Sequence, residues 1–196
     1  MWRKSEGDMK SQKKFIVTFL CCMTAIVSMA SCENAPENAV PVSGFNVVDY
    51  LGKWFEIARI DFKHEKDMSN VTANYVLNDD GTIKVINRGY DYVDGEWKES
   101  VGKAKFVGEP TVGALKVSFF GPFYTGYNII ALDEGYETAL VVGKDTNYMW
   151  ILSRTTTIPE DTKEEYLALA SKLGFDTNRL VWVDQGPYDA TIYDAK

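Results

Sequence analysis

The sequence offers few of the side chains that catalysis or metal binding requires. Its single histidine, His64, lies in the charged stretch Phe62-Lys63-His64-Glu65-Lys66, which is typical of a solvated loop. A Ser-His-Asp triad or a zinc site would have to use this histidine, with only carboxylates to complete the metal ligands. Asp79-Asp80-Gly81 reads as a turn, because no calcium-loop ligand periodicity follows it. The inventory predicts a chain that is not an enzyme and that has no metal or cofactor.

All three cysteines lie near the N-terminus, in a segment laid out as an export signal. Basic residues precede an apolar run from Phe15 to Ala30, which is shorter than the ~20 residues that span a bilayer. Met29-Ala30-Ser31-Cys32 resembles the lipobox of bacterial lipoproteins, in which the cysteine is lipidated and becomes the first mature residue. We expect a lipoprotein signal peptide at residues 1–31 and lipidation of Cys32. An ordinary signal peptide that contains a cysteine is the alternative.

Processing would change the character of the remaining chain. The polar run after Cys32 predicts a flexible tether over residues 32–44. No thiol would remain for a disulfide, so the exported domain would depend on its core for stability. Loss of the five basic and two acidic residues of the signal changes the formal net charge from −7 to −10. This charge argues against nucleic acid as a partner and against electrostatic binding to anionic lipid.

The domain that follows has the pattern of short strands separated by turns. Asn78-Asp79-Asp80-Gly81 and Asp94-Gly95 are hairpin turns, and no long crossover occurs before residue 154. The expected strands are 53–60, 71–77, 82–90, 97–107, 112–120, 127–132, 137–143 and 147–153. This pattern predicts an all-β fold, an eight-stranded antiparallel up-and-down β-barrel.

One helix and a short ninth strand complete the expected domain, which spans residues 45–186. Thr157-Ile158-Pro159-Glu160 fits a capping box with Thr157 as the cap, and Gly174 ends the helix. Apolar residues recur on one face of this C-terminal α-helix, which we expect to pack on the outside of the barrel. Residues 180–183 predict the ninth strand, and residues 187–196 read as an acidic tail.

The motifs at both ends of the barrel resemble those of the lipocalin family. Gly52-Lys53-Trp54 resembles the Gly-X-Trp motif of the first strand, and Arg154 resembles the arginine after the eighth strand. The resemblance implies that the indole plugs the closed end of the barrel and that the guanidinium packs across it. Gly52, Trp54 and Arg154 are therefore expected to be structural. Residues 115–124 and 148–155 resemble the bacterial lipocalins, which are typically outer-membrane lipoproteins.

Alternation along the strands predicts which side chains face the interior. If Trp54 points inward, then Glu56, Ala58 and Ile60 do so too. Glu56 would either contact a ligand or be satisfied by a tyrosine hydroxyl or a backbone amide. The other candidates for the ligand-binding wall are Ala73, Tyr75, Val85, Asn87, Val117, Phe119, Tyr127 and Ile129. An aromatic cluster lines the mouth, forms a dimer contact, or reflects hairpin packing; it consists of Phe119, Phe120, Phe123, Tyr124 and Tyr127.

The resemblance implies reversible binding of a fatty acid or a lysophospholipid. Anchored through Cys32 in the outer membrane and facing the periplasm, such a protein would store or transport lipids for envelope maintenance. Two alternatives remain. One is an interaction module whose barrel is filled by its own side chains. The other is a lipocalin-fold enzyme that acts on a lipophilic substrate through Glu56, Asp133 or His64.

Overall fold

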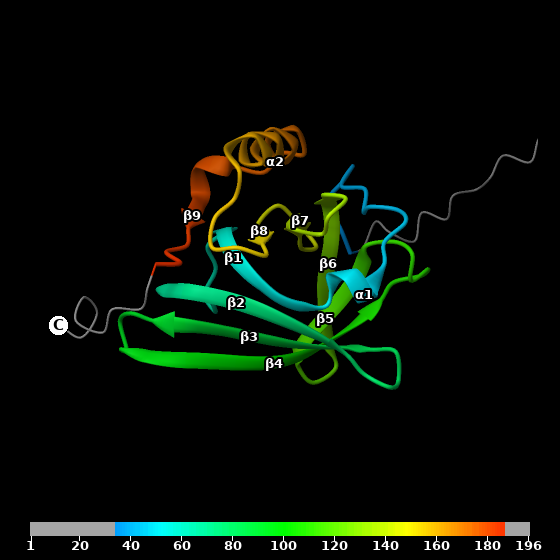
Figure 1. Ribbon diagram of the computed structural model, residues 1–196, viewed down its shortest axis with the longest axis horizontal. Helices are drawn as coiled ribbons and strands as arrows, with labels where there is room; N and C mark the ends of the chain where they lie inside the picture. Colours follow the sequence, from blue (N-terminus) through cyan, green and yellow to red (C-terminus); the bar gives the residue numbers. More distant parts are fainter. Residues whose placement is uncertain (1–33, 187–196) are drawn as a thin grey trace, which may run out of the picture.

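A computed structural model describes residues 34–186 of this protein (Figure 1). The predicted signal peptide, Cys32 and the acidic tail lie outside this range. The elements in chain order are α1 (Val47–Tyr50), β1 (Gly52–Ile60), β2 (Met68–Leu77), β3 (Ile83–Asp91), β4 (Glu96–Phe106), β5 (Ala114–Phe120), β6 (Phe123–Leu132), β7 (Thr138–Val142), β8 (Met149–Ser153), α2 (Glu160–Lys172), η1 (Thr177–Arg179) and β9 (Leu180–Trp182). None of the helices among the described residues is long and apolar enough to cross a membrane.

The first eight strands close into an antiparallel barrel, as the sequence predicts. Each of β2 to β7 pairs with the strand that follows it, and β1 pairs with both β8 and β2. The strands agree with the predicted ranges to within a few residues. The largest difference is β6, which begins at Phe123 rather than at 127 because the β5–β6 turn at Gly121-Pro122 is short.

The ninth strand and the residues after it bridge an opening in the barrel wall. β2 pairs with β1 only as far as Phe55, and β9 pairs with the later part of β1, from Ala58 to Ile60. The amide nitrogen of Gln185 donates hydrogen bonds to the carbonyl oxygens of Glu56 and Val71, at 2.8 Å each. One side chain thus joins β1 to β2 where their own hydrogen bonds end.

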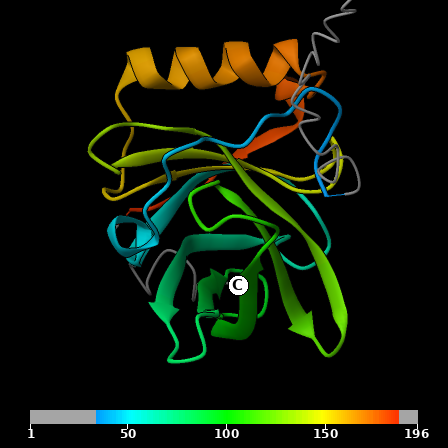
Figure 2. The same cartoon turned by 90° about the vertical axis from the view of Figure 1, so that its right-hand side faces the viewer.

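Two apolar cores lie on opposite faces of the barrel wall. One fills the closed end of the barrel around Trp54, and the other lies between the wall and α2. Figure 2 shows α2 lying across the outside of the barrel, above β7 and β8. Tyr166 and Ala170 are the buried residues of the helix, and the Tyr166 hydroxyl is 3.1 Å from that of Thr138. The external helix is therefore confirmed.

The two ends of α2 differ in how well the sequence predicts them. The predicted capping box is wrong: Pro159 is the N-cap and no side chain caps the helix. The carbonyl oxygen of Thr157 instead accepts a hydrogen bond from the Ser153 hydroxyl, which turns the chain out of β8. At the other end Gly174 has a φ of +86°, a backbone conformation that favours glycine, so the predicted stop is confirmed.

The segment expected to be a flexible tether lies against the barrel from Asn34 onward. Ala35 and Ala39 are buried in the core under α2. The Val42 amide donates to the carbonyl oxygen of Ile129 at 2.9 Å, and the Gly113 amide donates to the carbonyl oxygen of Val42 at the same distance. Residues 34–44 are therefore part of the folded domain.

Candidate ligand-binding cavity

The closed end of the barrel is held by Trp54 and Arg154. Trp54 is fully buried, and its indole nitrogen donates to the carbonyl oxygen of Tyr50 at 2.9 Å. The guanidinium carbon of Arg154 lies 4.0 Å from the centre of a Trp54 ring. Its nitrogens donate to the carbonyl oxygens of Asp49, Lys53 and Tyr136. Gly52 has a φ of +88°, and the Arg154 guanidinium lies over it.

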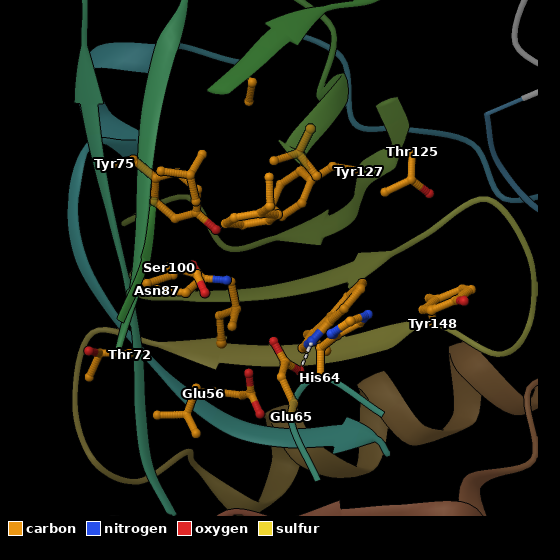
Figure 3. A pocket seen from close by; sticks show the side chains of 18 of the residues that line it. Glu56, His64, Glu65, Thr72, Tyr75, Asn87, Ser100, Thr125, Tyr127 and Tyr148 are labelled. Carbon is orange, nitrogen blue, oxygen red and sulfur yellow. Dashed lines mark hydrogen bonds between the residues drawn. The ribbon is translucent and has the colours of Figure 1, made fainter. Parts of the chain in front are cut away.

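A cavity of about 500 Å³ lies between this plug and the opposite, open end of the barrel (Figure 3). Its walls come mainly from β1 to β6, with contributions from β8 and from the β1–β2 loop at residues 61–67. Eight of the ten predicted candidates line it, namely Glu56, Ala73, Tyr75, Val85, Asn87, Val117, Phe119 and Tyr127.

Ala58 and Ile129 do not line the cavity. The pairing of β1 with β8 shifts register between Glu56 and Ala58, so β1 contains a bulge that reverses the alternation. Ile57, Ala58 and Ile60 consequently pack in the core under α2 instead of facing the interior. Ile129 is fully buried in the closed-end core and does not reach the cavity.

Three tyrosine hydroxyls form a polar floor. The Tyr127 hydroxyl is 2.7 Å from those of both Tyr50 and Tyr75. Burial raises the pKa of each of these phenols, so all three stay protonated at neutral pH. A chain of three hydroxyls can satisfy only two donors internally, which leaves one O–H available.

The opposite wall is acidic. Glu56 and Arg59 form a buried ion pair at 3.0 Å, and the Arg59 Nε also donates to Asp61 at 3.0 Å. Glu56 is thus satisfied by a guanidinium rather than by a tyrosine or a backbone amide. Sequence alternation puts Arg59 on the other face of β1, and only the bulge brings it beside Glu56. The signal that could have found this pair is an acidic and a basic residue three positions apart in a mainly apolar strand.

Glu65 is the main cavity residue that the sequence did not indicate. Its Oε2 accepts a hydrogen bond from the Trp150 indole at 2.9 Å, drawn as a dashed line in Figure 3. Burial raises the pKa of the Glu65 carboxyl to about 6, and it raises the pKa of neighbouring Glu56 well above its usual value. Figure 3 shows the two carboxyls on one side of the cavity and Tyr75 and Tyr127 on the other.

The mouth is aromatic. His64 is exposed and lines the mouth, with its ring 6.2 Å from that of Phe120. Of the predicted aromatic cluster, only Tyr124 is absent from the cavity wall; it lies beneath the ammonium groups of Lys105 and Lys116. Asp133 is also elsewhere, in the β6–β7 loop, where its carboxylate accepts hydrogen bonds from backbone amides. Among residues 34–186 no group of three or more His, Cys, Asp or Glu side chains could hold a metal ion.

Comparisons with known proteins agree with this architecture. A family model described as a lipocalin-like domain matches residues 45–185. The outer membrane lipoprotein Blc of Escherichia coli (strain K12) is 48% identical over 172 residues, which cover 87% of this chain and 97% of that protein. The Blc protein of Vibrio cholerae is 49% identical over 160 residues, covering 81% and 94%.

A solved structure supports the fold alone. Insecticyanin from the tobacco hornworm Manduca sexta matches with a TM-score of 0.62 at 18% identity, over 79% of this chain and 89% of that one. The family model covers most of the described residues, including the plugged end and the cavity walls. This chain therefore belongs to the lipocalin family.

Proposed function

We propose that this protein is a lipid-binding lipoprotein of the outer membrane. In this proposal Cys32 carries the lipid anchor, and the barrel reversibly holds a fatty acid or a lysophospholipid for storage or transport during envelope maintenance. The observation that carries the proposal is the cavity, plugged at one end and open at the other. Its 500 Å³ falls within the roughly 300–1,000 Å³ range of small-molecule sites. The relatives' name, outer membrane lipoprotein, supports the proposed location.

The cavity walls suit an acyl chain with a polar head. Val85, Val117 and Phe119 are among the apolar residues that would surround the chain. Each buried methylene contributes about 0.8 kcal/mol, so ten of them offset a large part of the entropic cost of binding. The chain would therefore supply most of the affinity, and polar groups would select the head.

Several polar groups are available for that selection. The Oδ1 atom of Asn87 is buried in the cavity wall and accepts no hydrogen bond within the described part of the chain. The Tyr50–Tyr127–Tyr75 hydroxyls offer a donor at the floor. A ligand hydroxyl or ester could satisfy these groups, which otherwise stay under-paired in an apolar setting.

The two alternative functions fit the structure less well. An interaction module with a filled barrel would not contain a cavity of about 500 Å³. For a lipocalin-fold enzyme that acts through Glu56, Asp133 or His64, the structure gives little support: Asp133 does not line the cavity, Glu56 is paired with Arg59, and His64 is exposed at the mouth. Binding without turnover is therefore the function that we propose.

Native mass spectrometry of the protein purified from membranes tests this proposal. We expect a bound mass that matches a fatty acid or a lysophospholipid and that excess competitor lipid displaces. Ala73→Phe, which fills the cavity, should reduce the bound fraction. Val76→Phe is the matched control, because Val76 lies on the same strand with 43% of its surface exposed. Bare protein that takes up no lipid, or equal loss in both variants, would contradict the proposal.

A further inference from the structure

The described chain begins at the open end of the barrel. The carbonyl oxygen of Asn34 accepts a hydrogen bond at 2.5 Å from the side-chain amide of Asn128, a buried residue of β6. The same amide nitrogen lies 3.4 Å from the carbonyl oxygen of Gly143, which begins the β7–β8 turn at the mouth. Gly126 leaves room for the Asn34 carbonyl group, because a methyl group at position 126 would collide with it. Asn34 is thus fixed on the outer face of β6, near the mouth.

From Asn34 the chain runs away from the mouth. Ala35 and Ala39 pack under α2, and the Phe45 amide donates to the carbonyl oxygen of Thr111 in the β4–β5 loop at the closed end. The distance to Cys32 is limited by covalent geometry alone. Two residues span at most about 7 Å, so the Cys32 backbone lies within that distance of Asn34.

An apolar surface lies at the same end of the barrel. Phe120 and Phe123 flank the β5–β6 turn, and they are 71% and 81% exposed. Phe123 is the first residue of β6, the strand that Asn34 packs against. Gly126, which contacts Asn34, lies roughly 10 Å further along this strand. Large apolar side chains exposed side by side in this way mark an interaction surface.

We propose that the bilayer holding the Cys32 acyl chains also covers the mouth of the barrel. The barrel would sit with its open end toward that membrane and with Phe120 and Phe123 in the boundary between head groups and acyl chains. This inference rests on the proposed lipidation of Cys32. The short span from Cys32 to Asn34 favours the bilayer over a second copy of the chain as the occupant. Ligand would then pass between membrane and cavity without crossing bulk water.

Site-specific quenching tests this orientation. The lipidated protein would be placed in phosphatidylethanolamine–phosphatidylglycerol vesicles that contain a doxyl-labelled lipid. Its mature chain has no cysteine besides Cys32, so single reporters can be introduced and labelled with the environment-sensitive dye NBD. Phe123→Cys and Lys144→Cys report on the mouth, because Phe123 is exposed there and Lys144, in the β7–β8 turn, also lines the cavity. Val48→Cys reports on the closed end, from a residue of α1 that is 63% exposed.

We expect doxyl lipid to quench both mouth reporters several-fold more than the Val48→Cys reporter. Gly126→Ala, which displaces Asn34, should weaken the quenching at the mouth. Equal or stronger quenching at the closed end would overturn the orientation. So would a blue-shifted, unquenched mouth signal that grows with protein density, because a second copy would then cover the mouth.

The same samples separate this inference from the proposed function. If the orientation alone is wrong, native mass spectrometry still detects bound lipid. If Cys32 carries no lipid, the protein does not associate with the vesicles, and both the anchor and the orientation are overturned while cavity binding is measured independently.

Discussion

At the scale of single residues, Arg154 contributes more than a charge. Its three nitrogens donate to three carbonyl oxygens, one in α1, one in β1 and one in the β6–β7 loop, while its plane covers Trp54. Lysine would keep the cation over the indole but not the planar fork of donors. We therefore expect Arg154→Lys to lower the free energy of unfolding by about 1–3 kcal/mol, because carbonyl groups lose their partners.

Urea unfolding checks this expectation. The matched control is Arg179→Lys, because Arg179 makes one side-chain hydrogen bond, to Asn147, on the surface. That change should stay within about 0.5 kcal/mol. If Arg154→Lys were equally mild, the cation over the ring would account for the whole effect and the hydrogen bonds would contribute little.

Glu65 predicts a pH dependence of stability. Burial raises the pKa of its carboxyl from 4.5 to about 6 in the folded state, so the fold favours the protonated form. The contribution of protonated Glu65 to the free energy of unfolding is fully present below about pH 4.5. It is lost as the pH rises through about 6, the pKa in the folded state. A shift of this size corresponds to ~2 kcal/mol at pH 8.

Glu65→Gln should remove this dependence. The neutral amide oxygen can still accept the Trp150 hydrogen bond, so we expect the variant to match the parent at pH 4 and to exceed its unfolding free energy at pH 8 by up to ~2 kcal/mol. Urea titrations at both pH values measure the difference. Glu134→Gln, in an exposed loop, is the control. An equal difference at pH 4 and pH 8 would show that ionisation is not the cause.

Single residues also show where sequence reasoning stops. Trp54 and Glu56 could be assigned to the barrel interior because alternation holds through the first half of β1. The bulge after Glu56 cannot be seen in the sequence, so strict alternation puts Ala58 on the wrong face and does not indicate that Arg59 lies beside Glu56. One extra residue reverses every later side chain in a strand.

At the scale of elements, the strands were predictable because their turns carry glycine, asparagine and aspartate at the required positions. The start of α2 was not predictable. Residues 157–160 have the composition of a capping box, but the Ser153 hydroxyl donates a hydrogen bond to the Thr157 carbonyl oxygen and Pro159 is the N-cap. The N-terminal segment was missed for a related reason. Its sequence is polar and short, and its burial depends on contacts with distant elements such as β6.

The docking of residues 34–44 leads to the next prediction. Ala39 is buried under α2, whereas its neighbour Val40 is 74% exposed. Ala39→Asp would bury a charge and should release the segment, lowering the free energy of unfolding by about 1–3 kcal/mol. Limited proteolysis should then cut within residues 34–44 several-fold faster. Val40→Asp should change neither measurement; if both variants behaved alike, the segment would be the flexible tether first expected.

At the scale of the whole molecule, the decisive property is whether the barrel is full or hollow. The sequence could not decide this, because a packed core and a cavity wall are built from the same residues. Val117 and Leu115 are equally plausible as either, and only the closed barrel shows that both line open space. Trp54 packs at the closed end of the barrel, and the bulge in β1 turns Ala58 and Ile60 away from the interior.

A hollow barrel that binds lipid must become more stable when lipid is present. At a free ligand concentration of 100 Kd, binding to the folded state alone raises the free energy of unfolding by about 2.7 kcal/mol. We expect this increase with lysophospholipid below its micelle concentration. Val117→Trp, which fills the cavity, should abolish it, whereas Val101→Trp, on the exposed face of β4, should keep it. Urea unfolding of each variant with and without lipid separates lost binding from lost stability. An increase that survives Val117→Trp would place the bound lipid outside the barrel.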